Sequence, residues 1–198
     1  MKIAIVGPEE SKWTEEQIPK VKCAIAQILD FAKNRRGLAR HDGIMKWITN
    51  DFPPYFGFYS WNNCKFIGEV EVILVSGHCP KGGVDIWAEE VADELSIKKE
   101  IYPAEVNQWE DKIHDYDTLP IRQKGYHSRN IQIAKACDVL YCFVPNTHSN
   151  LSRTMYVEIL SKNQYCIHCK IPDHPTNGGC WTMKYAKKLG KEVHLVVI

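Results

Sequence analysis

The sequence lacks long hydrophobic runs, an excess of charge of either sign, internal repeats and low-complexity tracts. No apolar run approaches the roughly 20 residues that a membrane-spanning helix needs, so no such helix is expected. The formal net charge of +1 supplies no broad basic surface, and binding to duplex nucleic acid is therefore not the favoured interpretation. The first apolar run, Ile3 to Val6, is too short for the core of a signal peptide. We therefore expect a cytoplasmic protein with no membrane partner.

The chain has the size and composition of an ordinary globular domain. Its 198 residues suffice for one well-buried core, and 44% hydrophobic with 25% charged residues is typical of soluble proteins. We expect a single domain over residues 1–198, interrupted by insertions at 35–68 and 146–180.

Short apolar runs rich in β-branched residues alternate with stretches of helical periodicity. This alternation is typical of an α/β fold of Rossmann type with a parallel sheet. The expected strands cover residues 3–6, 71–75, 97–102, 139–144 and 192–197. Helices are expected around residues 15–33, 87–95, 131–136 and 183–189, and the last should end at Gly190, a typical helix terminator.

A glycine-containing turn, residues 76–85, follows the second expected strand and opens the second expected helix. In a doubly wound fold this position presents backbone N–H groups and a helix N-terminus to an anion. The turn predicts a phosphate site, although a plain glycine turn in which Asp85 caps the helix is an equal alternative. The residues expected to contact the ligand here are Ser76, Gly77, Lys81, Gly82, Gly83 and Asp85.

Two further glycine turns should reach the same carboxyl edge of the sheet. Gly178 and Gly179 precede the last expected helix, and Gly7 with Pro8 follows the first expected strand. Their convergence favours one ligand crevice at the point where the strand order reverses.

Arg129 and Asn130 open the third expected helix. A guanidinium group beside an amide can hold a phosphate or a ribose hydroxyl from this position. A surface arginine next to a capping asparagine is the alternative.

Four motifs in this order resemble the SLOG superfamily of Rossmann-like nucleotide-binding proteins, which includes the SMF/DprA and LOG groups. The likeness is strongest to its YspA-like branch. The matching residues are Ile5-Val6-Gly7 with Trp13, Ser76-Gly77 with Gly82-Gly83-Val84-Asp85, Arg129-Asn130 with Ala134 and Ala136-Cys137-Asp138, and Gly178-Gly179 with Ala186 and Gly190-Lys191. The resemblance implies a three-layer fold whose five parallel strands have the order 3-2-1-4-5, with a nucleotide or nucleotide derivative over the strand ends.

The resemblance also raises the question of catalysis, because LOG enzymes release a base from a nucleoside monophosphate. Their Pro-Gly-Gly-x-Gly-Thr-x-x-Glu motif corresponds here to Gly178-Gly179-Cys180-Trp181-Thr182-Met183-Lys184, which has no glutamate. Binding or sensing of a nucleotide is therefore the first hypothesis. N-glycosidic hydrolysis of a nucleoside phosphate is the alternative, with Asp85 or Glu89 activating water.

A cluster of cysteine and histidine near the C-terminus predicts a small zinc-knuckle-like loop. Cys166, Cys169, His174 and Cys180 form the pattern C-x2-C-x4-H-x5-C, and soft or borderline ligands at such spacing suit a tetrahedral structural zinc beside the ligand crevice. His168 is the reserve fourth ligand, because Cys180 could instead face the ligand. The alternatives are reduced thiols with surface histidines, or a loop that contacts single-stranded nucleic acid.

The insertion at residues 35–68 is rich in aromatic rings around Pro53-Pro54 and follows several cations. Such a segment could form a lid that stacks on a base. A cover for the sheet edge or a contact between subunits of a homo-oligomer is the favoured interpretation. The residues concerned are Arg35, Arg36, Arg40, His41, Trp47, Phe52, Tyr55, Phe56, Phe58, Tyr59 and Trp61.

Overall fold

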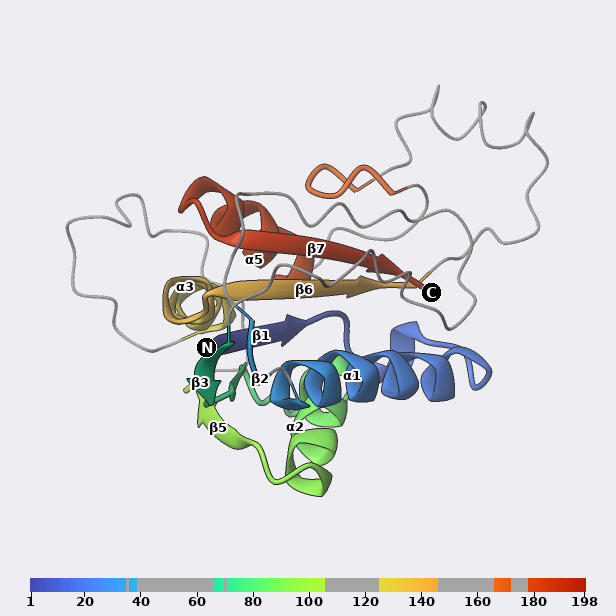
Figure 1. Cartoon of the computed structure of the whole chain (residues 1–198). Helices are drawn as coiled ribbons and strands as arrows, with labels where there is room; N and C mark the ends of the chain where they lie inside the picture. Colours follow the sequence, from blue (N-terminus) through green and yellow to red (C-terminus); the bar gives the residue numbers. More distant parts are fainter. Residues whose placement is uncertain (35, 39–65, 70, 106–124, 146–165, 172–177) are drawn as a thin grey trace.

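Five parallel strands form the central sheet of the computed structural model (Figure 1). The structure describes residues 1–34, 36–38, 66–69, 71–105, 125–145, 166–171 and 178–198. Within these residues the sheet order is β5-β4-β1-β6-β7, which is 3-2-1-4-5 when the five strands are numbered along the chain. The predicted α/β fold and strand order are therefore confirmed. The sheet strands are β1 (Lys2–Val6), β4 (Ile73–Ser76), β5 (Lys98–Ile101), β6 (Val139–Val144) and β7 (Glu192–Val197).

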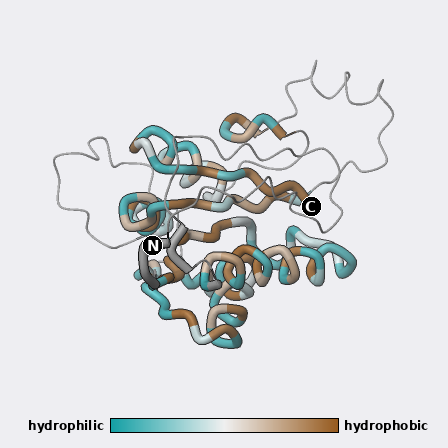
Figure 2. The backbone as a smooth tube through the Cα atoms, viewed as in Figure 1, coloured by the Kyte–Doolittle hydropathy of each residue, from teal (hydrophilic) through white to brown (hydrophobic). Residues whose placement is uncertain are grey.

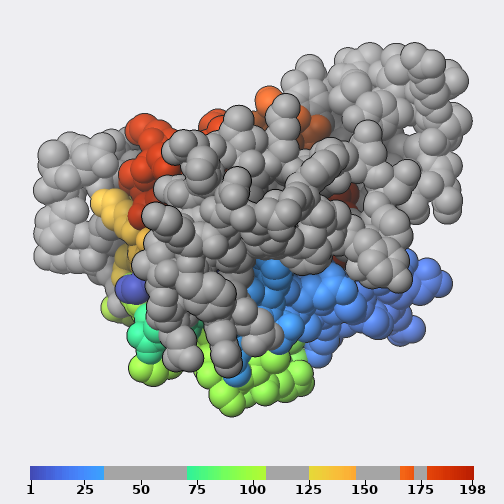
Figure 3. All heavy atoms as spheres, in the orientation of Figure 1, coloured from blue at the N-terminus to red at the C-terminus, as the bar shows by residue number. Residues whose placement is uncertain are grey.

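In the described part of the chain, two helices cover each face of the sheet. The helices α1 (Gln17–Asn34) and α2 (Val84–Glu94) pack on one face with the short 3-10 helix η1 (Glu10–Lys12) between β1 and α1. The helices α3 (Tyr126–Ala136) and α5 (Gly178–Lys188) pack on the other. Figure 1 shows α1 beside α2, and Figure 3 shows the two helices adjacent at the molecular surface.

The central strand β1 shows why the sheet has two cores. Ile3 and Ile5 point into the core under α1 and α2, whereas Ala4 and Val6 point into the core under α3 and α5. All four side chains are at most 3% exposed, as expected for a strand that is buried on both faces. In Figure 2 the hydrophobic colour accordingly concentrates on the central strands.

The end of α5 follows the glycine signal in the sequence. Gly190 has φ +75°, its N–H donates to the carbonyl oxygen of Lys187, and the N–H of Lys191 donates to that of Ala186. This pair of bonds is the Schellman arrangement that terminates helices. The predicted stop at Gly190 is confirmed.

Two short strands, β2 (Arg36–Leu38) and β3 (Phe66–Glu69), pair antiparallel at the ends of the first insertion. The intervening aromatic residues, and His174 of the second insertion, lie outside the described residues. The expectations about a lid, a subunit contact and the histidine ligand therefore stay predictions. Among the described helices, none combines the length and apolar character required to cross a membrane.

Candidate functional site

Hydrogen bonds connect the loop after β4 with α3 and the first turn of α5 at the carboxyl edge of the sheet. Arg129 Nη1 on α3 donates to the carbonyl oxygen of Gly77, which follows β4, at 3.1 Å. Arg129 Nε and Nη2 both donate to Asn130 Oδ1 at 3.3 Å. Asn130 Nδ2 in turn donates to the carbonyl oxygen of Gly178, the first residue of α5, at 3.3 Å, and Thr182 Oγ1 donates to the same oxygen at 2.6 Å. We call Gly77, Arg129, Asn130 and Gly178 the edge cluster.

Arg129 and Asn130 lie deeper in α3 than the sequence suggested. The helix begins at Tyr126, three residues before Arg129, so neither residue caps it. Arg129 is 8% and Asn130 2% exposed, which excludes the alternative of a surface arginine beside a capping asparagine. The guanidinium carbon also lies 5.0 Å from the centre of the Tyr126 ring. The orientation of the Arg129 guanidinium is therefore fixed by Gly77, Asn130 and Tyr126.

Asp85 is a buried carboxyl group beside this guanidinium. Its Oδ2 lies 3.9 Å from Arg129 Nη1, and the side chain is 6% exposed. Burial raises the pKa of Asp85 to about 6, although the charge of Arg129 acts in the opposite direction. A carboxyl group that titrates near neutral pH at the carboxyl edge of a parallel sheet is a candidate for proton transfer. Asp85 does not cap α2, because the cap residue is Gly83.

Gly77 is tightly enclosed by these two side chains. A Cβ atom at this position would lie 2.9 Å from the Arg129 guanidinium and 2.9 Å from Asp85 Oδ2. The absence of a side chain at Gly77 therefore lets the buried ion pair approach the backbone of the loop.

The Gly82-Gly83 turn packs against the connection after β1. Both residues have positive φ angles, and a Cβ on Gly83 would lie 2.5 Å from the carbonyl oxygen of Pro8. The N–H of Val84 donates to this same oxygen at 3.4 Å. The turn thus brings the N-terminus of α2 onto the Pro8 loop.

Carboxylates surround this second turn. Glu10 Oε2 lies 2.8 Å from the Cβ position of Gly82, and Lys81 Nζ lies 3.2 Å from a carboxylate oxygen of Glu9. The hydrogen bond from Lys81 lowers the pKa of Glu9, which stays ionised at neutral pH. An anion at this turn would meet negative charge, so the edge cluster offers an anion the better position.

Gly7, at the end of β1, also makes a close contact. A Cβ there would lie 2.6 Å from Val84 Cγ2 and 3.1 Å from the carbonyl oxygen of Phe143. Gly7 therefore allows α2 and β6 to converge above the end of β1.

Glu89, which the sequence suggested as a catalytic residue, is held between two side chains. Ser76 Oγ donates to Glu89 Oε1 at 2.5 Å, and His78 Nδ1 lies 2.8 Å from Glu89 Oε2. Ser76 is fully buried, the Glu89 side chain is 10% exposed and the His78 side chain is 54% exposed. Sequence reasoning missed His78, whose only signal was its place directly after Gly77.

The structure brings three of the four predicted metal ligands together. The Sγ atoms of Cys166, Cys169 and Cys180 all lie within 4.8 Å of one another. Tetrahedral zinc with bonds of about 2.3 Å requires sulfur atoms about 3.8 Å apart, so this set fits such an ion after small adjustments. Three thiol ligands also match the soft-donor preference of zinc over magnesium or calcium.

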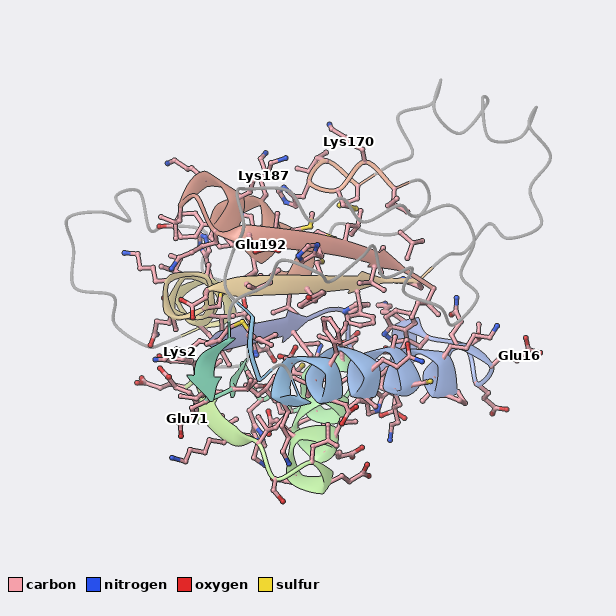
Figure 4. The ribbon with its side chains drawn as sticks, viewed as in Figure 1. Lys2, Glu16, Glu71, Lys170, Lys187 and Glu192 are labelled. Atoms are coloured by element: carbon pink, nitrogen blue, oxygen red, sulfur yellow. The ribbon has the colours of Figure 1, made fainter. Side chains whose placement is uncertain are left out.

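The loop that carries two of these cysteines is a tight turn. The N–H of Cys166 donates to the carbonyl oxygen of Ile171 at 3.0 Å, and the N–H of Lys170 donates to that of Cys166 at 2.9 Å. Lys170 adopts φ +66°, the left-handed conformation that reverses the chain. In Figure 4, Lys170 and Lys187 of α5 point outward on the same side of the molecule.

Besides His174, which lies outside the described residues, two groups are candidates for the fourth ligand. Cys142 Sγ on β6 lies 4.0 Å from Cys180 Sγ, and the hydrogen bond between the thiols raises the pKa of Cys180. Among the described residues, His168 Nδ1 is buried without a hydrogen-bond partner, and burial lowers the pKa of its ring. A neutral imidazole is the form that binds metal. Cys142 had no signal in the sequence, because this residue lies well before the C-x2-C-x4-H-x5-C pattern in the chain.

Comparison with solved structures found similarity to a known protein. Neither a protein-family model nor a curated protein matched the chain. DNA processing protein A from Streptococcus pneumoniae superposes with a TM-score of 0.38 at 12% sequence identity, over 98% of this chain and 58% of that chain. The chain thus spans somewhat more than half the length of this neighbour.

Proposed function

We propose that this chain binds a nucleotide or a nucleotide derivative at the carboxyl edge of its sheet, where the edge cluster receives the phosphate. The observation that carries the proposal is the row of hydrogen bonds from Gly77 through Arg129 and Asn130 to Gly178. Segments that are far apart in sequence thereby surround one buried guanidinium group.

The chemistry of this cluster suits a phosphate. A guanidinium group presents planar N–H donors that match phosphate oxygens, and its positive charge is only partly balanced by Asp85 at 3.9 Å. The backbone at Gly178 and Gly179 opens α5, an 11-residue helix whose N-terminus carries partial positive charge toward the same place. Ser76, Gly7, Pro8 and the Gly82-Gly83 turn with Lys81 would shape the surrounding walls.

A structural zinc held by Cys166, Cys169 and Cys180 belongs to the same proposal. Cys180 lies two residues after Gly178, in the first turn of α5. A metal that fixes Cys180 would therefore fix the Gly178 carbonyl oxygen that Asn130 binds. The zinc would act structurally, by holding the first turn of α5 against the knuckle-like loop.

The proposal is tested by calorimetric titration of the intact protein with nucleoside mono-, di- and triphosphates. At least one should bind with a Kd below about 100 μM, whereas the matching nucleosides without phosphate should bind at least about tenfold more weakly. Equal affinity for a nucleoside and its phosphate would contradict the assigned phosphate position. Binding only to single-stranded oligonucleotides, with a steep salt dependence, would favour a nucleic-acid contact instead.

A second candidate function is hydrolysis of the N-glycosidic bond of a bound nucleoside phosphate. It is favoured by Asp85, whose pKa of about 6 leaves part of the population protonated near neutral pH, so that it could donate a proton to a leaving base. Chromatographic detection of free base after incubation with nucleoside monophosphates would establish turnover. Ligand binding with no released base would leave the first function and exclude the second.

A further inference from the structure

Ser76, Glu89 and His78 form a continuous row of hydrogen bonds from the core to the surface at the end of β4. Glu89 Oε1 accepts the Ser76 hydroxyl at 2.5 Å, and Glu89 Oε2 lies 2.8 Å from His78 Nδ1. The backbone N–H of His78 also donates to Ser76 Oγ at 3.2 Å. His78 adopts φ +49°, a left-handed conformation that is uncommon for a residue with a side chain. Backbone strain of this kind concentrates at functional sites.

The row determines which nitrogen of His78 is basic. A carboxylate only accepts hydrogen bonds, so Nδ1 must carry the hydrogen that faces Glu89. In the neutral ring Nε2 is then the unprotonated nitrogen, on a side chain that is 54% exposed. Ser76 meanwhile occupies the other oxygen of Glu89, which keeps the carboxylate from turning. Glu89 is thus poorly placed to contact water itself, whereas His78 is well placed.

The row borders the edge cluster. Gly77 lies between Ser76 and His78 in the chain, and its carbonyl oxygen accepts the hydrogen bond from Arg129. Asp85 precedes Glu89 by one helical turn, and both carboxyl groups influence each other electrostatically. A carboxylate that orients an imidazole, and an imidazole whose basic nitrogen is exposed, are the elements of general base catalysis.

We infer that His78 is the general base of an N-glycosidic hydrolysis at this site, and that Glu89 and Ser76 are positioning residues for its ring. The inference rests on the second function proposed above. The substrate class is a nucleoside 5′-phosphate whose phosphate lies at Arg129 and whose C1′ faces His78.

Atoms and electrons balance in this step. A water molecule gives one proton to His78 Nε2 while its oxygen forms a bond to C1′ of the ribose. The bond from C1′ to the base nitrogen breaks, and its electron pair leaves with the base, which takes the proton of Asp85. His78 then returns its proton to solvent and Asp85 regains one, so that one water is consumed for each base released.

The test compares His78→Gln with His194→Gln in the full-length protein. His194 is a suitable control, because its Nε2 also pairs with a carboxylate, Glu192 Oε1, at 3.0 Å, and both residues lie on β7, away from the loop that holds His78. His78→Gln should lower kcat for base release at least about 100-fold, with KM changed less than about threefold, whereas His194→Gln should keep both within about twofold. Imidazole in the buffer should restore part of the activity of His78→Ala. Unchanged kcat in His78→Gln, or no base release by the wild-type protein, would overturn the inference.

The positioning roles have their own spectroscopic readout. Nitrogen-15 NMR of the histidine rings should find His78 in the tautomer with hydrogen on Nδ1, and Glu89→Gln should change this signal while the His194 signal stays constant. Glu89→Gln should reduce kcat more than it reduces nucleotide affinity. A His78 ring with its hydrogen on Nε2 in the wild-type protein would contradict the proposed row. Nucleotide affinity measured on the same variants reports separately on the first function, so the two failures are distinguishable.

Discussion

The side-chain amide of Asn130 donates a hydrogen bond to the carbonyl oxygen of Gly178 across 3.3 Å, which joins α3 to the first residue of α5. Cys180 follows in the next position but one, and its sulfur lies among the three close thiols. The proposed anion position and the proposed metal position therefore share the first turn of α5. We therefore expect metal binding and nucleotide binding to affect each other through that shared turn.

The first prediction concerns this coupling. Removing zinc with a chelator should weaken nucleotide binding about five- to tenfold, because the first turn of α5, which carries the Gly178 carbonyl, is then no longer anchored through Cys180. In Asn130→Ala the same treatment should have less than about a twofold effect, since the connection to Arg129 is already lost. Titration calorimetry with and without chelator measures both. Equal chelator effects in the two proteins would mean that the metal acts by another route.

The second prediction concerns Gly77. Gly77→Ala places a Cβ 2.9 Å from the Arg129 guanidinium, which must move, and nucleotide affinity should fall at least about tenfold. Gly190→Ala is the matched control: it strains a left-handed residue with φ +75°, but a Cβ there has no atom within 4 Å. It should lower the free energy of unfolding by about 1 kcal/mol and leave affinity unchanged. An affinity loss of the same size in both variants would show only general destabilisation.

A third prediction addresses the metal. The purified protein should contain about one zinc per chain by elemental mass spectrometry, and serine at Cys166, Cys169 or Cys180 should lower this content by more than half. Cys23→Ser, which changes an exposed thiol on α1, is expected to keep it. His174→Gln, Cys142→Ser and His168→Gln identify the fourth ligand, because only replacement of a true ligand should reduce the zinc content. A structural metal would be ruled out if the wild-type protein contained no zinc and if its melting temperature were the same with and without added zinc.

The fourth prediction follows from the buried carboxyl group of Asp85. Its pKa is about 6 in the folded protein, against an ordinary value of 3.8 for an aspartate in water, so the folded state binds the extra proton between these values. The stabilisation from this proton is fully present only below the unfolded-state pKa of 3.8 and is lost as the pH rises through 6. Asp85→Asn has no such proton, and its stability relative to wild type should therefore increase by about 2–3 kcal/mol between pH 4 and pH 8.

Urea unfolding of Asp85→Asn and wild type at several pH values measures this difference directly. Subtracting the two curves removes the contribution of the titrating groups that do not interact with Asp85. A difference that stays flat across this range, or that has the opposite slope, would show that the folded-state pKa of Asp85 is not raised.

The sequence predicted the sheet well because strand burial leaves a clear pattern. All five expected strands exist, and the order 3-2-1-4-5 followed from the resemblance rather than from periodicity. The start of α3 was placed too late, since Tyr126, His127 and Ser128 have no apolar periodicity of their own. They are helical because tertiary packing buries this turn, which residue propensities do not reveal.

The site was only partly predictable for the same kind of reason. Glycine, arginine and cysteine signals located Gly77, Arg129 and the three thiols, because each of these residue types has few structural uses in its pattern. The approach of Cys142 to Cys180 depends on which face of β6 is covered by α5. The pairing of Glu89 with His78 depends on the left-handed conformation of His78 itself, directly after Gly77. Neither is encoded in local spacing.

The central claim is that a phosphate binds at the edge cluster, and an NMR titration with the best nucleotide ligand tests it most directly. Phosphate binding there should produce saturable shifts of the backbone amides of Gly77, Gly178 and Gly179 and of the Arg129 Nε resonance, with the Gly190 amide unmoved. Saturable binding that shifts none of the first four signals would contradict the assigned site.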